Sequence, residues 1–566
     1  NDFNFAANIE NSALKSSLSM RSKSRWGNPN ATAKTASASV KVANSVVGDH
    51  GHPIPRQIVW IREGWVDLSF NKILGVKSSG PQNFKFGSFG FDLGRGIALG
   101  SAYGVSPGLL GFYTNNVIDQ YANGILFSGD IVKDKLSYGV YLTMLENQSD
   151  KLDSNLFPAF AQEIGKRDAP WRGFGRMNSV FASKLTLKIK DPVCTSGMLT
   201  VEPYGMVNNA PEQRLEFDSD AKNVLGTVGL SCEYNGSNIE WGFDLATNLG
   251  HQRVRSWDRN IVQAKNVDGV LTETYSNVYS DSAKTTNAVV TTANKTTVDS
   301  SLQAVSQNGL QIGTSGLYNS DTRFRPGYKN KYNGFMFVGD FASWVYKKEL
   351  KLACTFAYVT GDENPNKDLT DPLSSSVDGT YGGFVGLQEI YSGKRVKSAM
   401  VLSSVAIPRP MTSPFNTRIP RKDRFANSVS GFTNLVFFGA GAEWAPSGWC
   451  AKFKFKPNVL GYWQESATKK FDSVAKLSIN EPANKFLGIE VNGFLSIDLA
   501  KNLSGFAIMG LFVPGGHFDD IKGRPLSADH IAILESQDKT GYTGDSPPVL
   551  GTKRAIMINW GLEYSF

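Results

Sequence analysis

Apolar and polar residues alternate at period two in many segments of this chain, most plainly at its carboxyl end. Counted back from Phe566, every second residue as far as Ile556 is apolar, and those between Phe566 and Ile558 are small or polar. Successive side chains of a strand point to opposite faces, so the alternation predicts a strand with one apolar face. In segment 484–500 the predicted apolar face comprises Leu487, Ile489, Val491, Leu495, Ile497 and Leu499. The predicted polar face comprises Glu490, Asn492, Ser496 and Asp498.

Similar segments recur as consecutive pairs along the chain. We predict strands at 57–71 and 83–96, 119–133 and 135–148, 176–190 and 197–210, 223–236 and 237–254, 331–347 and 349–362, 431–446 and 448–464, 484–500 and 502–514, and from 553 onward. Two or three more precede residue 57. Short connections, as at Asp134 and 501–502, alternate with long ones such as 255–330 and 363–430. This sorting is typical of membrane barrels with short periplasmic turns and long extracellular loops.

The fold class predicted from these patterns is all-β: a transmembrane antiparallel up-and-down β-barrel of about 18 strands, with about 16 as the fallback. We expect residues 1–566 to form one domain. Hydrophobic residues make up 41% of the chain, yet no stretch is long and apolar enough for a membrane-spanning helix. The chain starts at Asn1 without a charged-then-apolar segment, so we expect a mature form.

Basic residues recur on the polar faces of several predicted strands. A charge on the lipid face at mid-membrane costs about 2–4 kcal/mol, so these residues are expected to point into the lumen. The pore-lining candidates are Lys15, Arg21, Lys23, Arg25, Lys184, Lys188, Lys190, Lys452, Lys454, Lys456, Glu490 and Asp498. Net charge is +8. Two interpretations stay open: a lining that selects anions, or a neutral wall in which inward carboxylates such as Glu240 and Asp244 pair with the cations.

The predicted loop 363–430 is rich in basic residues and also contains Phe415 and Phe425. It is either a solvated loop or a constriction that attracts anions or clamps lipopolysaccharide phosphates. The constriction candidates are Lys394, Arg395, Lys397, Arg409, Arg418, Arg421, Lys422 and Arg424. Segment 262–312 is rich in Thr, Ser, Asn and Val, and we expect an extracellular flap there.

Motifs for cofactor chemistry are weak. Gly94 to Gly100 superficially resembles a dinucleotide loop, but neither a helical segment nor a downstream acidic partner follows, so a loop turn is favoured. Residues 49–52 contain two histidines without further ligands, and a flexible loop is favoured over a metal site. Oxygen-bearing residues alternate at Asp362, Asn364, Asn366 and Asp368, as they do in calcium loops, but a hydrated loop is favoured because Lys367 replaces the usual glycine. We therefore predict no enzyme activity and no cofactor other than possible Ca²⁺.

The four cysteines have no zinc-like spacing. Parity places Cys354 on a lipid-facing side and Cys450 on a lumenal side, so these two are not expected to pair. Cys194 and Cys232 remain a possible disulfide between neighbouring strands, with small apolar filler as the default.

Two resemblances bear on these expectations. The aromatic carboxyl terminus resembles the closing strand of bacterial outer-membrane barrels, which implies recognition by the barrel assembly machinery. The assembly signal would comprise Trp560, Leu562, Tyr564 and Phe566. Segments 62–67 with 84–87, and 358–365 with 371–373, are similar to an early hairpin and a mid-barrel strand exit of the alginate-export-type porins, a family of 18-stranded barrels.

The function expected from pattern and resemblance together is a non-enzymatic porin in the outer membrane of a Gram-negative bacterium. It would pass hydrophilic solutes by diffusion and favour anions. An exporter of an anionic polysaccharide is the first alternative, and an adhesin or structural barrel with a plugged lumen is the second. Expected partners are outer-membrane lipids, lipopolysaccharide and the assembly machinery, and nucleic acid is not expected.

Overall fold

The computed structural model describes part of the chain. The described residues are 2–10, 13–23, 58–76, 80–100, 121–145, 178–190, 197–210, 221–254, 257–258, 263–264, 290–292, 295–297, 304–305, 324–325, 328–362, 379–387, 393–397, 432–447, 453–474, 477–523 and 549–564. Among them, no helix is long and apolar enough to cross a membrane.

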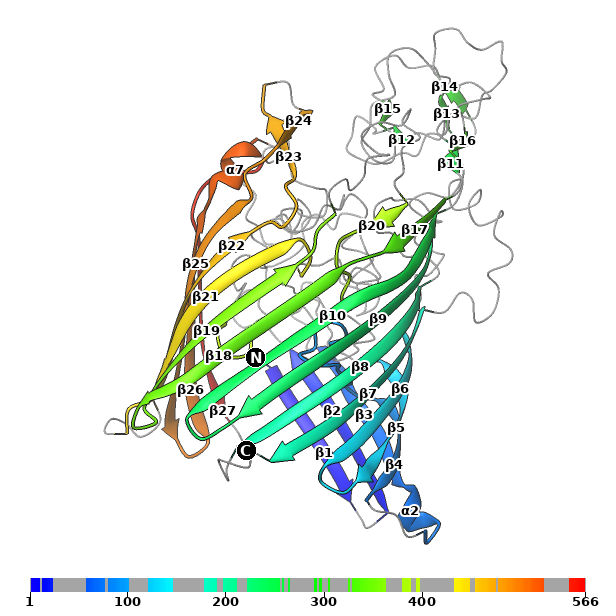
Figure 1. The fold of residues 1–566 in the computed structure, drawn as a ribbon, viewed down its shortest axis with the longest axis vertical. Coiled ribbons are helices and arrows are strands. Elements are labelled where there is room, and N and C mark those ends of the chain that lie inside the picture. The colour runs from blue at the N-terminus through cyan, green and yellow to red at the C-terminus, as the bar shows by residue number, and fades with distance from the viewer. Residues whose placement is uncertain are drawn as a thin grey trace.

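Strands dominate the described residues (Figure 1). The first group is β1 (Asp2–Glu10), β2 (Leu14–Lys23), β3 (Ile58–Ser69), β4 (Gln82–Ser88), β5 (Asn123–Val132), β6 (Leu136–Leu145), β7 (Asn178–Lys190), β8 (Met198–Ala210), β9 (Ala221–Asn235) and β10 (Ile239–Val254). The second is β17 (Tyr328–Tyr332), β18 (Phe335–Tyr346), β19 (Leu350–Val359), β20 (Thr380–Tyr381), β21 (Leu435–Trp444), β22 (Phe453–Trp463), β25 (Phe486–Ala500), β26 (Leu503–Pro514) and β27 (Ala555–Tyr564).

Smaller elements lie outside this ladder. They are α2 (Phe70–Ile73), α7 (Gly516–Asp520), β11 (Trp257–Asp258), β12 (Gln263–Ala264), β13 (Val290–Thr292), β14 (Lys295–Thr297), β15 (Ala304–Val305), β16 (Phe324–Arg325), β23 (Lys469–Asp472) and β24 (Leu477–Pro482). The predicted flap at 262–312 falls mostly outside the described residues, apart from the short pairs β12–β15 and β13–β14.

The main sheet contains 19 strands among the described residues, and sequence neighbours pair antiparallel along nearly all of it. β17 continues β18 along β10, and β20 adds a two-residue parallel bridge to β17. Seventeen long strands therefore alternate in direction, between the predicted 18 and its fallback of 16. The predicted all-β antiparallel fold is confirmed.

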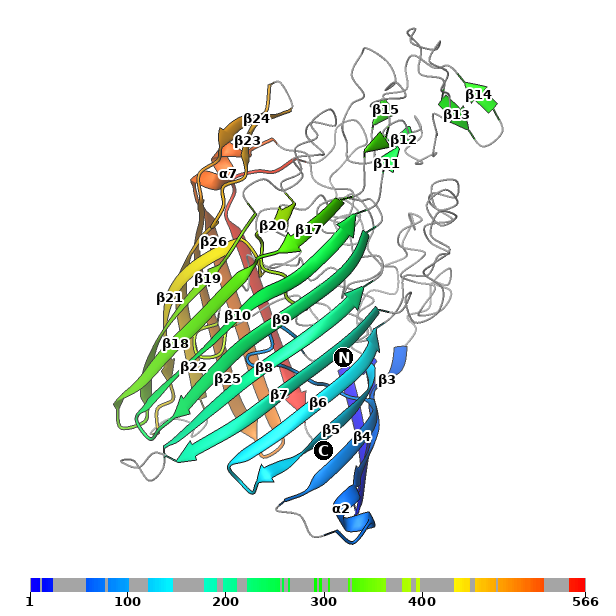
Figure 2. The same cartoon turned by 45° about the vertical axis from the view of Figure 1, so that its right-hand side comes forward.

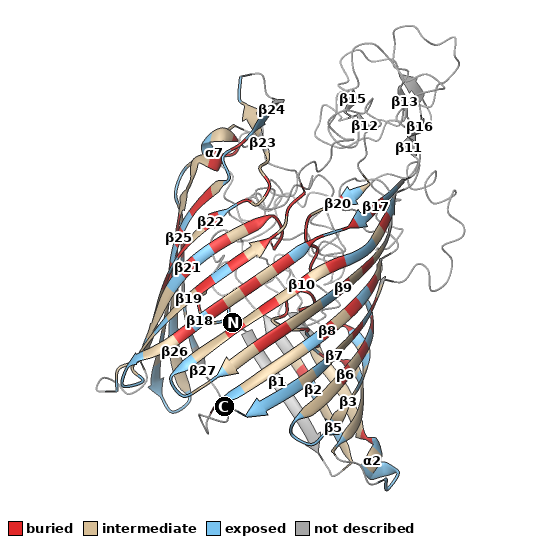
Figure 3. Cartoon of the chain, in the orientation of Figure 1, coloured by how far each residue is buried: buried red, intermediate tan, exposed pale blue. Residues whose placement is uncertain are grey.

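One face of the sheet is apolar and exposed, because alternate residues of each strand share a face. Its exposed side chains include Phe127, Leu142, Phe181, Leu185, Val207, Val228, Leu249, Phe341, Leu352, Phe356, Phe438, Val459, Val491, Met509 and Trp560. The closing strand follows the predicted alternation, with Ile556, Ile558, Trp560 and Leu562 exposed and Met557 buried. Figure 3 shows exposed and buried residues alternating along the strands.

Leu487 departs from its predicted place on the apolar exposed face. It is fully buried, whereas Ile489 and Val491 are exposed as predicted. Gly488 between them has a φ of 140°, and the pairing of β22 with β25 shifts register at this point. A β-bulge at Gly488 reverses the alternation on its N-terminal side, and periodicity in the sequence alone does not reveal such a bulge.

Short and long connections lie at opposite ends of the sheet (Figures 1 and 2). β5 and β6 are joined by residues 133–135, and β25 and β26 by residues 501–502, whereas β23, β24 and α7 lie at the other end. Leu503 lies opposite Tyr564 and Glu10 opposite Lys15, so β27 and β1 both run toward the short-turn end.

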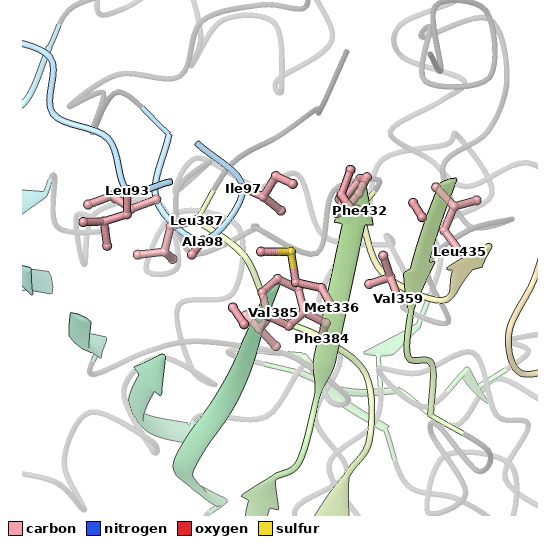
Figure 4. Packing of buried hydrophobic residues seen from close by; sticks show 14 of the residues in the cluster. Leu93, Ile97, Ala98, Met336, Val359, Phe384, Val385, Leu387, Phe432 and Leu435 are labelled. Carbon is pink, nitrogen blue, oxygen red and sulfur yellow. The ribbon is translucent and has the colours of Figure 1, made fainter. Parts of the chain in front are cut away.

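The other face encloses a hydrophobic cluster. Two segments that leave the ladder supply part of it: residues 89–100, here the first inner segment, and the described residues 379–387 and 393–397, here the second inner segment. Figure 4 shows Phe384 and Val385 of the second segment beside Met336 of β18. The interior is therefore partly filled by the chain itself.

Candidate lumenal site

The first inner segment begins where β4 ends. Gly87 has a φ of 122°, and a Cβ at this position would lie 2.3 Å from the carbonyl oxygen of Gly64 on β3. Only glycine fits such a close approach without strain. The predicted strand 83–96 therefore stops at Ser88, and the chain turns inward instead of continuing the ladder.

A tight turn in this segment presents Arg95. Leu93 N donates to Leu99 O at 3.0 Å, and Gly96 N donates to Leu93 O at 2.8 Å. Gly94 has a φ of 55°, and a Cβ there would lie 2.6 Å from Asp244 Oδ2. Residues 94–96 form the turn that the sequence favours over a dinucleotide loop.

The two inner segments are joined to each other and to the wall. Leu387 N donates to Ala98 O at 2.9 Å, next to a parallel bridge between Leu99 and Leu387. The buried amide of Asn248 on β10 pairs with the backbone of Val385, accepting from its N at 2.6 Å and donating to its O at 3.1 Å. Buried amide groups that satisfy each other in this way fix the position of a segment.

Four carboxylates surround Gly242 on the inner face of β9, β10 and β18. Glu233, Gly242 and Asp340 form one cross-strand row, since Gly242 lies opposite both acids. Glu240 and Asp244 lie two residues to either side of Gly242 on β10. Because residues i and i+2 share a face, all four carboxylates lie on the same face of the sheet as Gly242.

Arg95 occupies the space above Gly242. Its Nε donates to Glu233 Oε1 at 2.8 Å, and its two terminal nitrogens donate to the two oxygens of Asp340 at 2.9 and 3.0 Å. Its backbone N donates to Asp244 Oδ2 at 2.8 Å. The Arg95 side chain is 3% exposed and that of Asp340 is 1% exposed, so the paired charges are almost fully removed from solvent.

Arg395 of the second inner segment binds the same carboxylates. It contacts Asp340 through Nη1, Glu233 Oε2 through Nη2 at 3.2 Å, and Glu240 Oε2 through Nε at 3.4 Å. We call Arg95, Arg395 and the carboxylates Glu233, Glu240 and Asp340 the arginine site. Lys394 and Lys351 reach the same acids, the first at Glu233 and the second at Glu240, each at 3.2 Å.

A second charged region lies on β21 and β22. Lys454 and Lys456 both pair with Glu443, at 3.1 and 2.8 Å respectively. Lys397 of the second inner segment is held nearby: its backbone O accepts from Asn492 on β25, and its Nζ donates to Gly393 O, each at 3.0 Å. Burial lowers the pKa of Lys397, and the positive charge of Lys456 lowers that pKa further. We call Lys397, Lys454, Lys456 and Glu443 the lysine wall.

The remaining pore-lining candidates are scattered. Lys184 on β7 pairs with Glu202 at 3.4 Å and with Asp92 at 3.5 Å. Glu490 is buried and accepts from Asn492 at 2.7 Å. Lys15, Lys188, Lys190 and Asp498 are exposed near the short-turn end.

Several predicted residues are placed only in part or not at all. Arg21 and Lys23 lie in β2, and Tyr564 lies in β27. The predictions for Arg25, Lys452, Arg409, Arg418, Arg421, Lys422, Arg424 and Phe566 lie outside the described residues.

The predicted metal and disulfide sites also lie partly outside the described residues. Asp362 is buried, and Asn364, Asn366 and Asp368 lie outside the described residues. Within the described ranges, no three His, Cys, Asp or Glu side chains gather as a metal site would require. Cys232 and Cys354 are free thiols, whereas Cys194 and Cys450 lie outside those ranges.

Sequence reasoning missed Arg95, Glu233 and Asp340, the centre of the arginine site. The alternation along β9, β10 and β18 could have pointed to the two acids. Inward carboxylates recur on these three neighbouring strands, which have few inward lysines to pair with them. The partner is harder to find, since Arg95 comes from a segment 138 residues from Glu233 in sequence.

A large antiparallel sheet with an apolar exposed face and charged groups on the other is the fold of outer-membrane β-barrels. No family model matches the chain, and no curated protein matches it. Among solved structures it is similar to OccK10 (OpdN) of Pseudomonas aeruginosa, with 6% identity, coverage of 90% of this chain and 86% of that chain, and a TM-score of 0.34.

Two further solved structures are similar. OccK8 (OprE) of Pseudomonas aeruginosa is 10% identical, with 90% of this chain and 86% of that chain covered and a TM-score of 0.34. The outer membrane channel DcaP of Acinetobacter baumannii is 7% identical, with 82% and 78% covered and a TM-score of 0.30. Scores this low identify neither a substrate nor a site, and the resemblance to alginate-export-type porins stays a prediction.

Proposed function

We propose that this protein is a non-enzymatic channel of the bacterial outer membrane that passes small hydrophilic solutes by diffusion and favours anions. The observation that carries the proposal is the division between the two faces of the sheet. Apolar side chains such as Phe181 and Leu352 are exposed on one face, and ion pairs lie on the other. In water the exposed face would be unfavourable, whereas acyl chains would cover it.

The proposed preference for anions follows from how the inward carboxylates are paired with basic side chains. Glu233, Glu240 and Asp340 are bound by two arginines and two lysines, so their negative charge is compensated locally. In the lysine wall, by contrast, Lys454 and Lys456 share the single carboxylate of Glu443 and stay partly exposed. A permeating anion would therefore meet a positive excess there.

The inner segments would act as the constriction. Lys394, Arg395 and Lys397 belong to the predicted constriction loop: the first two pair with Glu233 of β9, and the backbone O of Lys397 accepts from Asn492 of β25 at 3.0 Å. In this proposal the pore runs beside these segments. Lipids and lipopolysaccharide would surround the barrel, and the assembly machinery would read the aromatic strand at its carboxyl end.

A structural or adhesive barrel with a plugged lumen is the second candidate. The hydrophobic cluster around the inner segments favours it, because an apolar core inside a barrel occupies space that solute would need. A polysaccharide exporter, the first alternative from the sequence, is a further candidate that rests on sequence resemblance alone.

Conductance in a planar bilayer distinguishes the candidates. We expect discrete channel openings, and in a KCl gradient a reversal potential whose sign corresponds to Cl⁻ permeation. Membranes that stay silent after insertion of the folded protein would support the plugged barrel, and a cation-selective reversal potential would contradict the proposed preference. Block of the current by polyuronate but not by neutral dextran would support the exporter.

A further inference from the structure

The connection between β3 and β4 begins with a mainly apolar stretch, residues 70–76. It contains α2, after which Leu74 N donates to Phe70 O at 2.8 Å, and a turn follows in which Val76 N donates to Asn71 O at 2.9 Å. Phe70, Ile73, Leu74 and Val76 are between 38% and 70% exposed. Four large apolar side chains within seven residues are thus open to the surroundings.

These side chains continue the exposed apolar face of the sheet. The ring of Phe70 lies 5.6 Å from that of Phe84, and the ring of Phe84 lies 4.8 Å from that of Phe127. Phe84 and Phe127 are opposite each other on β4 and β5, and Phe127 is exposed on the outer face. Residues 70, 73 and 74 form one stripe of a helix, so Ile73 and Leu74 extend the same surface beyond the strand ends.

Polar contacts hold the connection in this orientation. The Asn71 side chain donates to Gly80 O and accepts from Gln82 N, each at 3.4 Å. Gln82 in turn donates to Asp130 O at 2.9 Å and accepts from Tyr138 at 2.7 Å. The polar side of the connection is therefore held at the ends of β4, β5 and β6, while its apolar side chains stay exposed beside the outer face.

Two other connections at the same end are charged. Residues 133–135 are Lys-Asp-Lys, and residues 347–349 are Lys-Lys-Glu. Such turns suit water at the membrane surface. The composition of 70–76, in which Lys72 is the single charge, is that of a segment at a membrane interface, where apolar side chains enter the acyl region and a lysine reaches the headgroups.

We propose that residues 70–76 form an interfacial anchor that lies in the bilayer leaflet at the short-turn end. Phe70, Ile73 and Leu74 insert among acyl chains next to the barrel wall, and Lys72 binds lipid phosphate. The inference rests on the proposed location in a membrane. The occupant is lipid, because the apolar surface of the anchor is continuous with the face of the sheet that lipid would cover.

Spin labels in liposomes test the anchor. Labels are placed at Leu74→Cys, at Asp134→Cys in the polar turn as the matched control, and at Phe127→Cys on the outer face as the reference, in a chain whose native cysteines are serine. Accessibility to O₂ and to a water-soluble nickel chelate reports depth. We expect the label at 74 to lie about 5–10 Å below the headgroup boundary and the label at 134 to lie in water.

The outcomes separate the anchor from the proposed function. A label at 74 that behaves like the label at 134, while the label at 127 is in lipid, overturns the anchor alone. A label at 127 in water overturns the membrane location itself. Protection of residue 74 from both reagents would mean that protein covers it, and this also contradicts the anchor. If the cysteine-free chain does not fold, the difference in fluorescence quenching by acyl-brominated lipids between Leu74→Trp and the native chain reports whether residue 74 lies among acyl chains.

Discussion

Two regions of the inner face carry charge, and they differ in where the opposite charge comes from. In the arginine site the wall supplies acids, and Arg95 and Arg395 arrive from two inner segments that are distant in sequence. In the lysine wall, Glu443 on β21 pairs with both Lys454 and Lys456 on the neighbouring strand. The first arrangement joins separate parts of the chain, and the second joins strands that already pair.

Burial separates the two regions as well. Both arginine side chains are at most 4% exposed, whereas those of Lys454 and Lys456 are 45% and 34% exposed. Loss of one partner from an ion pair that is shielded from water is strongly destabilising, whereas a solvated ion pair contributes little to stability. The arginine site should therefore determine structure, and the lysine wall should determine which ions pass.

Neutralising Asp340 should produce the largest loss of stability. Asp340→Asn keeps the shape of the side chain but leaves both arginines with less negative charge, and we expect the free energy of unfolding to fall by about 3–5 kcal/mol. Denaturant unfolding in detergent, followed by tryptophan fluorescence, measures it. Glu443→Gln is the matched control and should cost at most about 1 kcal/mol. Equal losses in the two variants would remove the distinction between the regions.

The position of Arg95 depends on the missing side chain at Gly242. A Cβ there would lie 2.6 Å from Arg95 Nη2 and 2.4 Å from Glu233 Oε2. Both atoms are ends of long side chains, yet their ion pairs hold them in place, so we expect Gly242→Ala to cost about 1–3 kcal/mol.

The control for Gly242 is another inward glycine. At Gly139 on β6 a Cβ would have no neighbour closer than 3.6 Å, so Gly139→Ala should change unfolding little. In bilayers, Gly242→Ala should also broaden the distribution of conductance levels if the first inner segment borders the pore. A Gly242→Ala variant as stable as Gly139→Ala would show that the arginine can move without loss.

The sequence predicts the outer face well and the interior poorly, for a physical reason. Period two along one strand decides its exposed side, so Phe181, Val459 and Trp560 are correctly placed from local pattern alone. The pattern fails at Leu487 because the bulge at Gly488 shifts register, a property of two strands together. Local periodicity contains no information on such a shift.

The interior depends on contacts between residues far apart in sequence. Arg395 was among the predicted constriction residues because its loop is basic, but nothing local indicates that it meets Glu233, 162 residues away. Gly94 and Gly96 signal a turn, and the turn is present, yet its role in presenting Arg95 becomes visible only when Asp244 and Asp340 are located.

Removing charge from the lysine wall should change selectivity with little effect on stability. The double substitution Lys454→Gln with Lys456→Gln leaves Glu443 without either of these partners. We expect the reversal potential in a KCl gradient to shift toward the value for K⁺ permeation. The free energy of unfolding should change by about 0–1 kcal/mol, because both lysines are partly solvated. Lys394→Gln removes a partly exposed lysine that pairs with Glu233 of the arginine site, and it is the control for loss of positive charge alone. A larger shift with the control would place the selective region at the arginine site.

The smallest expected effect is a dependence on pH through Lys397. Its pKa lies below the ordinary lysine value, first because of burial and then because of Lys456. As pH rises from neutral through that lowered pKa, Lys397 loses its proton while exposed lysines remain charged, so anion preference should begin to weaken at a lower pH than ordinary lysines would allow. Stability changes in the opposite direction to anion preference. Burying the charged ammonium is unfavourable at neutral pH, and this cost disappears as pH rises from the folded to the unfolded pKa, so the free energy of unfolding should increase over that range. Reversal potentials measured stepwise from neutral to alkaline pH test the prediction, and Lys397→Gln should remove the early part of the decline. An unchanged profile in that variant would assign the titration to the exposed lysines, and Lys397 would then contribute to the position of the second inner segment but not to the charge that a permeating ion meets.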